Sequence, residues 1–165
     1  MSNLKLTGII GLVGAILCGT GEFLLHFDPS ARFSGYDFMA DISDARLTVG
    51  HFFAVVGVPL YFVGMWHIAQ MLKPAGEKMS AALFLIGCFG FLYGAMWMSS
   101  RASIGSLVHY PELIVETNLV AFYELRSETL LQVTRITTLV ISGLYVYMVL
   151  TGKSQSSTAT TNQTV

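Results

Sequence analysis

Residues 79–100 read MSAALFLIGCFGFLYGAMWMSS and contain no Asp, Glu, Lys, Arg or His. A helix needs about 20 predominantly apolar residues to cross the ~30 Å hydrocarbon layer of a bilayer, and this segment supplies them. Three further apolar stretches of similar length lie on either side of it: Thr7–Phe27, Leu47–Leu72 and Ile136–Gly152. The sequence therefore predicts an all-α fold, a bundle of four transmembrane helices.

The composition of the whole chain agrees with a membrane environment. Of its 165 residues, 53% are hydrophobic and only 12% are charged, whereas a soluble domain carries roughly 25% charged residues. The mean hydropathy is +0.63. The formal net charge of -1 leaves no basic surface of the kind that binds nucleic acid. Cys18 and Cys88 lie inside apolar runs, so we expect no disulfide framework.

The ionisable residues that interrupt the apolar stretches set the bounds of the membrane domain. We expect one domain over residues 1–153, with spans at about residues 6–27, 47–72, 79–101 and 128–152. The Ser/Thr-rich tail at residues 154–165 lacks a hydrophobic pattern and is expected to be disordered. The first span has no clear small-residue cleavage site, so we expect it to stay in the mature protein.

A longer region separates the third span from the last. Pro111 suits the first turn of a helix. A helix from there to Leu150 would be about 40 residues or ~60 Å long, which is more than a bilayer requires. We therefore expect a break or bend near Glu124–Ser127. The part before it would be an interfacial helical segment that caps the bundle.

Small residues and two ionisable residues form one face of the first helix. Members of this face recur at spacings of three or four: Gly8, Gly11, Ala15, Gly19, Glu22 and His26. Small side chains let helix backbones approach closely in lipid. Because a carboxylate that faces hydrocarbon costs about 2.5 to 3.5 kcal/mol, we expect Glu22 and His26 to point into the bundle near its outer end.

Polar residues gather in the outer halves of all four helices. If these faces converge, they form a polar cavity that opens outward. Four of the residues are candidates for catalysis, the first two as the proton-transfer pair: Glu22, His26, His51 and Glu128. Five others are candidates for ligand binding: Arg46, Trp97, Arg101, Gln132 and Arg135.

This cavity favours the binding of a membrane lipid or another lipophilic small molecule, with acid–base chemistry on it such as isomerisation, cyclisation or hydrolysis. Arg101 and Arg135 would anchor an anionic or carbonyl group. Whether the protein is an enzyme stays open, because the same charges could simply pair and hold the helices together. In that alternative the protein is a non-catalytic accessory or assembly subunit of a membrane complex, as a homo-oligomer or with a membrane partner. A proton-coupled carrier is disfavoured, since the inner half of the bundle offers almost no relay groups.

No metal and no other cofactor is expected. Imidazole and carboxylate groups on facing helices are ligands for zinc or iron. Residues of this chemistry are present: Glu22, His26, His51 and Glu128. Their spacing, however, lacks the Glu-x-x-His pair of di-iron bundles.

Three short motifs stand out in the first two helices: GEFLL at Gly21–Leu25, Arg46 with Gly50, and PLYFVGMWH at Pro59–His67. Together they resemble an uncharacterised family of small bacterial four-helix integral membrane proteins. The resemblance covers mainly the first two helices. It supports the architecture and implies no activity.

The basic residues predict the orientation. With four crossings, both termini and the turn at residues 73–78 share one side of the membrane. All four lysines fall on that side and all five arginines on or near the other, but three of the arginines lie beside carboxylates that would neutralise them. We therefore place the lysine side in the cytoplasm of a bacterial cell, with the protein in the inner membrane and both termini cytoplasmic.

Overall fold

A computed structural model describes residues 3–28, 36–110, 112 and 119–161 of the chain. These residues form four long α-helices and two short 3-10 helices: α1 (Asn3–His26), η1 (Asp37–Asp41), α2 (Asp44–Leu72), η2 (Lys73–Ala75), α3 (Glu77–Val108) and α4 (Leu119–Thr161). Each long helix contains a stretch apolar enough to cross a membrane, with mean hydropathies from 1.6 to 1.9. The predicted all-α, four-helix architecture is confirmed.

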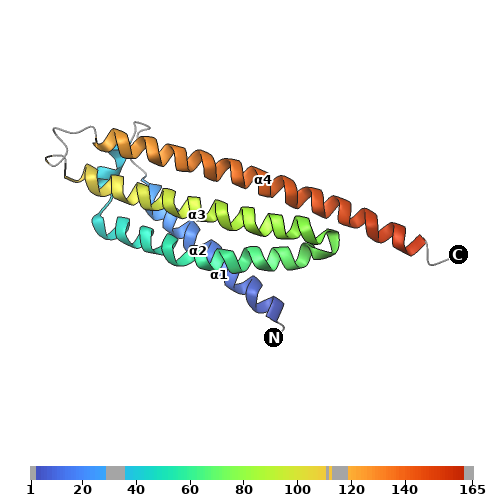
Figure 1. Cartoon of the computed structure of the whole chain (residues 1–165). Coiled ribbons are helices and arrows are strands. Elements are labelled where there is room, and N and C mark those ends of the chain that lie inside the picture. The colour runs from blue at the N-terminus through green and yellow to red at the C-terminus, as the bar shows by residue number, and fades with distance from the viewer. Residues whose placement is uncertain (1–2, 29–35, 111, 113–118, 162–165) are drawn as a thin grey trace.

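The long helices run up and down and pack in the order of the chain (Figure 1). α1 lies against α2, α2 against α3, and α3 against α4. α1 and α4 are not packed against each other in the described part of the chain. The start of α1, η2 and the end of α4 lie toward one end of the bundle, and η1 lies at the other (Figure 1). α1 and α4 are therefore the outermost helices.

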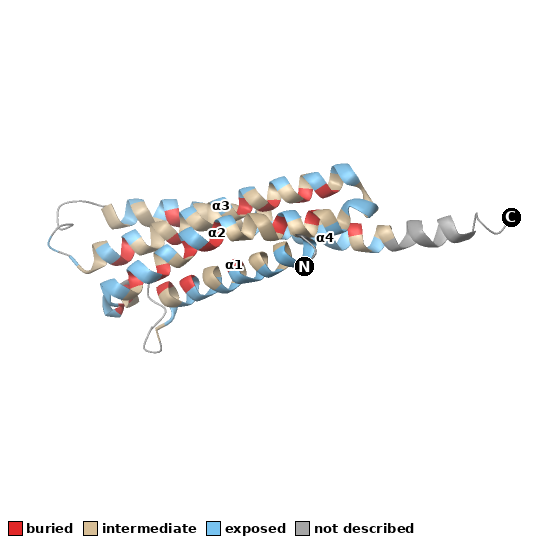
Figure 2. Cartoon of the chain, turned by 90° about the horizontal axis from the view of Figure 1, so that it is seen from below, coloured by how far each residue is buried: buried red, intermediate tan, exposed pale blue. Residues whose placement is uncertain are grey.

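Most apolar side chains of these helices point outward. Only 6% to 28% of each membrane-crossing stretch is buried inside the protein, and Leu12, Leu85 and Leu139 are 62%, 65% and 73% exposed. Figure 2 shows exposed residues along every long helix. In water such a surface would aggregate, whereas the acyl chains of lipids solvate it. The chain is therefore an integral membrane protein.

A seam of glycines joins α1 to α2. A Cβ built on Gly11 would lie 2.5 Å from the Cα of Gly64, and one built on Gly57 would lie 2.5 Å from the Sγ of Cys18. The two backbones are thus closer than any side chain would allow, which is how helices gain contact in lipid. Other glycines of this seam are Gly8, Gly14, Gly21 and Gly50.

The small face predicted on α1 is only partly the face that packs against α2. Gly11 lies in the seam, but a Cβ on Gly19 would meet no atom within 4 Å, and Glu22 is exposed. The prediction of one continuous packed face is therefore wrong. The face divides at its outer half, where Gly19 and Glu22 turn away from α2.

The spacing of the seam explains this division. Gly14 and Gly21 on α1 are seven residues apart, as are Gly50, Gly57 and Gly64 on α2. A seven-residue period keeps two helices in contact when they cross at a small left-handed angle. From Gly11 to Gly19 the predicted face advances by two steps of four residues, about 80° more than two full turns, so this part of the face leaves the line of the seam.

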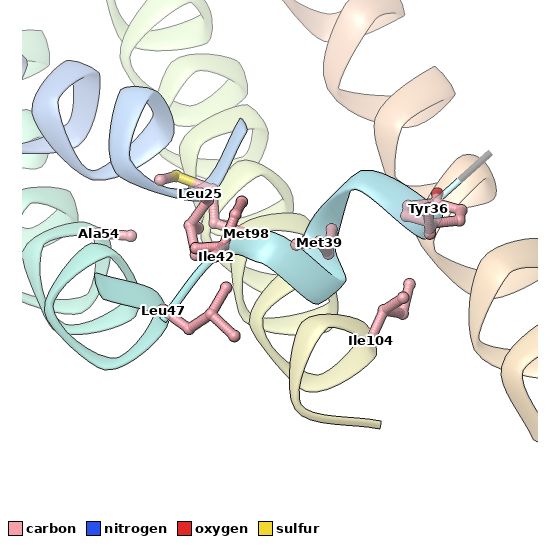
Figure 3. Close-up of a cluster of buried hydrophobic side chains, with 8 residues drawn as sticks. All are labelled: Leu25, Tyr36, Met39, Ile42, Leu47, Ala54, Met98 and Ile104. Atoms are coloured by element: carbon pink, nitrogen blue, oxygen red, sulfur yellow. The ribbon is translucent and has the colours of Figure 1, made fainter. Parts of the chain in front are cut away.

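The described residues before α2, from Tyr36 to Ser43, fold over the end of the bundle at which α1 ends and α2 begins. Met39 and Ile42 are 0% and 1% exposed. They pack with buried side chains of α1, α2 and α3, namely Leu25, Leu47 and Ile104 (Figure 3). η1 therefore closes this end of the bundle as an apolar plug.

α4 differs from its prediction. It is continuous from Leu119 to Thr161, so the predicted break near Glu124–Ser127 is wrong. No Gly or Pro occurs at residues 119–142 to interrupt the helix. α4 also continues past residue 153, where we expected a disordered tail, because each residue added to an existing helix gains a backbone hydrogen bond. Of the predicted interfacial segment that begins at Pro111, residues 111 and 113–118 lie outside the described residues, and residues 119–124 are the first turns of the continuous helix α4. η1 caps the bundle.

Candidate functional site

A cavity of about 260 Å³ lies between α1 and α4, over a floor formed by α2 and α3. We call it the groove. Its lining is mostly apolar or small: Cys18, Gly19, Val58, Tyr61, Phe91, Gly94, Met98, Leu131 and Thr134, with Glu22 and Trp97 as the polar exceptions. Because α1 and α4 do not close over it, the groove opens sideways toward the bilayer.

Glycine positions keep the groove open. A Cβ on Gly19 would meet no atom within 4 Å, and the nearest atom to one on Gly94 is a methyl carbon of Thr134, at 3.7 Å. At the inner end, the rings of Tyr61 and Phe91 stack with their centroids 4.0 Å apart. The groove therefore has a flat aromatic floor and room for an apolar ligand.

Glu22 stands at the rim of the groove. It lines the cavity and is exposed. It also borders a shallower hollow on the surface of α1, with Gly19, Phe23, His26 and Phe27. Its carboxylate makes no ion pair with any described residue. Arg101 pairs with Glu128 instead. An unpaired carboxylate at membrane depth is costly and marks a functional candidate.

A column of stacked side chains extends from Trp97, which lines the groove, to Tyr36 at the start of η1. The rings of His26 and Trp97 are nearly parallel, at 9°, with centroids 5.1 Å apart. The guanidinium carbon of Arg101 lies 5.3 Å from the centroid of Trp97 and 4.3 Å from that of Tyr36. We call these four residues the column. It joins α1 and α3 to the start of η1.

The column is tied to α4 through Glu128. Arg101 Nη2 lies 2.9 Å from Glu128 Oε1, and the Tyr36 hydroxyl donates to the same oxygen at 3.0 Å. The Arg101 side chain is 11% exposed and that of Glu128 is 49% exposed. Figure 3 shows Tyr36 at the end of η1 beside α4. The ion pair therefore links three elements that are distant in sequence.

Three nitrogens of the column have no partner. His26 Nε2, Trp97 Nε1 and Arg101 Nε are buried and make no hydrogen bond to any described residue. Buried polar atoms almost always find a partner, and leaving one unpaired costs about 1 to 3 kcal/mol. Trp97 lines the groove, and His26 borders the shallower hollow beside Glu22, so a ligand or water in these spaces is the candidate for the missing partner.

The hydrogen bond of His26 Nδ1 determines whether His26 Nε2 can accept a proton. His26 Nδ1 lies 2.9 Å from the backbone oxygen of Glu22, which can only accept a hydrogen bond. Nδ1 therefore carries the proton, and Nε2 of the neutral ring presents a lone pair. The column thus offers one base and two N–H donors, from Trp97 and Arg101.

The structure brings together some of the predicted site residues and not others. Glu22 and Trp97 line the groove. His26 and Arg101 do not line it but contact the ring of Trp97, and Glu128 joins them through Arg101. His51 lines a different cavity, between α2 and α3.

The three remaining candidates lie outside the groove. Arg46 donates to the carbonyl oxygens of Phe23 and Phe27 and so caps the end of α1. Gln132 and Arg135 are exposed on α4 and are not among the residues that line the groove. In the part of the chain that the structure describes, no three His, Cys, Asp or Glu side chains are arranged to hold a metal ion.

Tyr36 is the functional residue that the sequence analysis missed. It sits in a connection, where a solvated loop is the ordinary expectation. One signal could have revealed it, namely the run YDFMADI at residues 36–42, which is too apolar for a solvated loop. Such a run predicts a segment that folds back onto the bundle.

Tyr36 makes the stability of the folded protein depend on pH. Burial raises the pKa of its phenol, and the hydrogen bond to Glu128 raises it further, while the charge of Arg101 opposes both. Since the pKa is higher in the folded state, the stabilisation from Tyr36 is full below about pH 10 and is lost as pH rises through the folded-state pKa. We expect Tyr36→Phe to lower the unfolding temperature in detergent near neutral pH, and this difference from wild type to shrink in strong alkali. A difference that stayed constant with pH would contradict this account.

The fold and the groove define the class: an integral membrane protein of four long helices with a side-opening cavity. The chain belongs to DUF6796, a family of unknown function whose match covers residues 1–161. This family match spans all four long helices, whereas the resemblance noted from the sequence covers mainly the first two. Comparison with curated proteins and with solved structures finds no match.

Proposed function

We propose that the protein binds a lipophilic molecule bearing a carbonyl or hydroxyl group in the groove and moves protons on it. The observation that carries this proposal is the set of three unpartnered nitrogens on Trp97, which lines the apolar cavity, and on the two residues in contact with its ring, His26 and Arg101. Apolar walls suit the body of such a ligand. An oxygen at its head would supply the partner that the nitrogens lack.

The column has the parts needed for acid–base catalysis. His26 Nε2 would take a proton from carbon or oxygen of the ligand. The N–H groups of Trp97 and Arg101 would stabilise the negative charge that then develops on the ligand oxygen. Glu22, protonated at the start of the cycle, would give its proton to another atom of the ligand. The proton taken up by His26 would then pass back to Glu22 through water at the rim, so that an isomerisation needs no co-reactant. The apolar walls favour isomerisation or cyclisation over hydrolysis, because hydrolysis needs a water molecule in the groove.

The positive charge of Arg101 narrows the choice of ligand. Glu128 already pairs with this guanidinium and offsets its charge. A neutral carbonyl or hydroxyl therefore suits the column better than a fully charged phosphate does. The groove would take up its ligand sideways from the bilayer. With both termini in the cytoplasm of a bacterial cell, it would open to the periplasmic half of the inner membrane.

A second candidate function is that of a non-catalytic accessory subunit. It is favoured by the way Arg101, Glu128 and Tyr36 tie α3, α4 and η1 together, which is a structural task. In that case Glu22 and His26 would serve assembly with a membrane partner or a second copy.

The single variants Glu22→Gln and His26→Ala separate these candidates. Each is purified in detergent and assayed by size exclusion for folding and by mass spectrometry for copurifying lipophilic molecules. If the groove is a ligand site, folded yield is kept and ligand retention falls about tenfold, the effect of one hydrogen bond to a charged group. Loss of folding in both variants would support the accessory subunit.

Gly19→Leu tests the groove without touching an ionisable group. A leucine side chain there would enter the cavity without meeting protein atoms, because a Cβ at Gly19 has open space around it. We expect normal folding and loss of the bound molecule. Gly143→Leu is the matched control, since Gly143 on α4 also has no atom within 4 Å of its Cβ position and lies outside the groove. Equal ligand retention by the two variants would refute the groove as the site.

A further inference from the structure

A second cavity, of about 290 Å³, lies between α2 and α3 near the outer end of the bundle. We call it the α2–α3 pocket. The polar and aromatic residues in its lining are Thr48, His51, Phe52, Ser99, Ser103 and Ser106. Ser99 follows Trp97 by two positions, about 200° around the helix. The pocket and the groove therefore open on different sides of α3.

The pocket lining is polar but carries no Asp, Glu, Lys or Arg. A phosphate or an ammonium group would find no counter-ion in it. The chemistry of the pocket is therefore that of uncharged hydrogen bonds.

Two of the three serine hydroxyls of the pocket have already used their protons. Ser103 Oγ donates to the carbonyl oxygen of Ser99 at 3.1 Å, and Ser106 Oγ donates to that of Ala102 at 3.2 Å. A hydroxyl has one proton and two lone pairs, so these oxygens are left as acceptors. His51 adds a buried Nδ1 without a hydrogen-bond partner among the described residues, which points to an absent partner. A ligand hydroxyl matches this lining, because it can donate to the oxygens of Ser103 and Ser106 and accept from the hydroxyls of Thr48 and Ser99.

The position of the pocket identifies the source of such donors. It lies within about two or three turns of the start of α2 at Asp44 and the end of α3 at Val108. At that depth, lipid headgroups meet their acyl chains. Phe52, at 57% exposure, offers an apolar surface beside the pocket along which an acyl chain can lie.

We propose that the α2–α3 pocket binds the hydroxyl-bearing headgroup of a membrane lipid, of the glycerol or sugar type. The acceptor oxygens of Ser103 and Ser106 would receive the headgroup hydroxyls, and His51 would complete the site. This assignment gives His51 a role apart from the groove. It does not depend on the function proposed for the groove.

The test compares two lipids that differ only in headgroup hydroxyls. The full chain is placed in vesicles with equal amounts of phosphatidylglycerol and phosphatidylpropanol, which share one phosphodiester charge and a three-carbon headgroup. Retained lipid is measured by mass spectrometry after mild extraction. We expect phosphatidylglycerol to be enriched roughly fivefold, the effect of about one net hydrogen bond. In the double variant Ser103→Ala/Ser106→Ala the ratio should fall toward one.

The double variant should fold, because serine bonds to the preceding turn contribute little to helix stability. Its matched control is Thr129→Ala/Thr138→Ala, which removes two hydroxyls that make the same kind of bond on the exposed side of α4. The control should keep the wild-type ratio. Equal retention of the two lipids by wild type would overturn the proposal. So would binding of free glycerol to the pocket without any retention of the lipid. So would a wild-type dimer that the serine variant abolishes, because the pocket would then receive a helix of a second copy.

Discussion

Gly11→Ala should lower the yield of folded protein more than any other single methyl group added to this chain. The new Cβ would lie 2.5 Å from the Cα of Gly64, which is backbone and cannot swing aside. α1 and α2 must then separate along the seam, and overpacking of this kind costs about 1 to 3 kcal/mol. The measurement is the unfolding temperature in detergent, together with the monodisperse fraction by size exclusion. Gly64→Ala should behave alike, because its Cβ would lie 2.9 Å from the Cα of Gly11.

Gly143→Ala is the control for this prediction. Its Cβ would meet nothing within 4 Å, and alanine favours a helix over glycine by up to about 1 kcal/mol. This variant should be as stable as wild type or slightly more stable. If Gly11→Ala and Gly143→Ala unfolded at the same temperature, close packing of α1 on α2 would not hold the bundle together.

Arg101→Met should have the second large effect, because it removes three contacts at once. The guanidinium pairs with Glu128 and lies over the rings of Tyr36 and Trp97. We expect a loss of about 1 to 2 kcal/mol in stability, near the lower range for a charged hydrogen bond because Glu128 is half-exposed and stays hydrated. Thermal unfolding in detergent measures it. The double variant Arg101→Met/Glu128→Gln should lose less than the sum of the single variants, since it leaves no unpaired carboxylate. Additive losses would contradict a direct interaction.

Arg101→Lys distinguishes binding from stability at the same position. Lysine keeps the charge that pairs with Glu128 but lacks the planar guanidinium and its Nε–H donor. We expect most of the stability to remain and ligand retention in the groove to fall. A lysine variant that retained the ligand fully would remove Arg101 Nε from the proposed site.

Secondary structure and membrane insertion could be read from sequence because both depend on short stretches of chain. A run such as residues 79–100 has nowhere to reside but in lipid or a protein core, and four such runs are too many for a core of this chain length. The groups of the candidate site were also recognisable. Glu22, His26 and Arg101 stand out because ionisable residues in apolar helices are costly.

The sequence could not show which of those residues meet in the folded protein. Helical spacing placed Glu22 on one face with Gly11, but it could not say which neighbour that face meets. The answer depends on the crossing angle of α1 and α2, which the seven-residue glycine seam sets. Likewise His51 appeared to belong with His26, and the packing of α2 on α3 put it in another cavity.

The sequence by itself determined that the chain is a four-helix membrane protein with its polar chemistry near one face, because transfer into lipid is decided by each segment separately. Only the tertiary structure decided that α1 and α4 stay apart, that a groove opens between them, and that η1 brings Tyr36 onto Arg101. These features arise from contacts between distant segments, whose energies depend on fit between surfaces and not on the composition of either one.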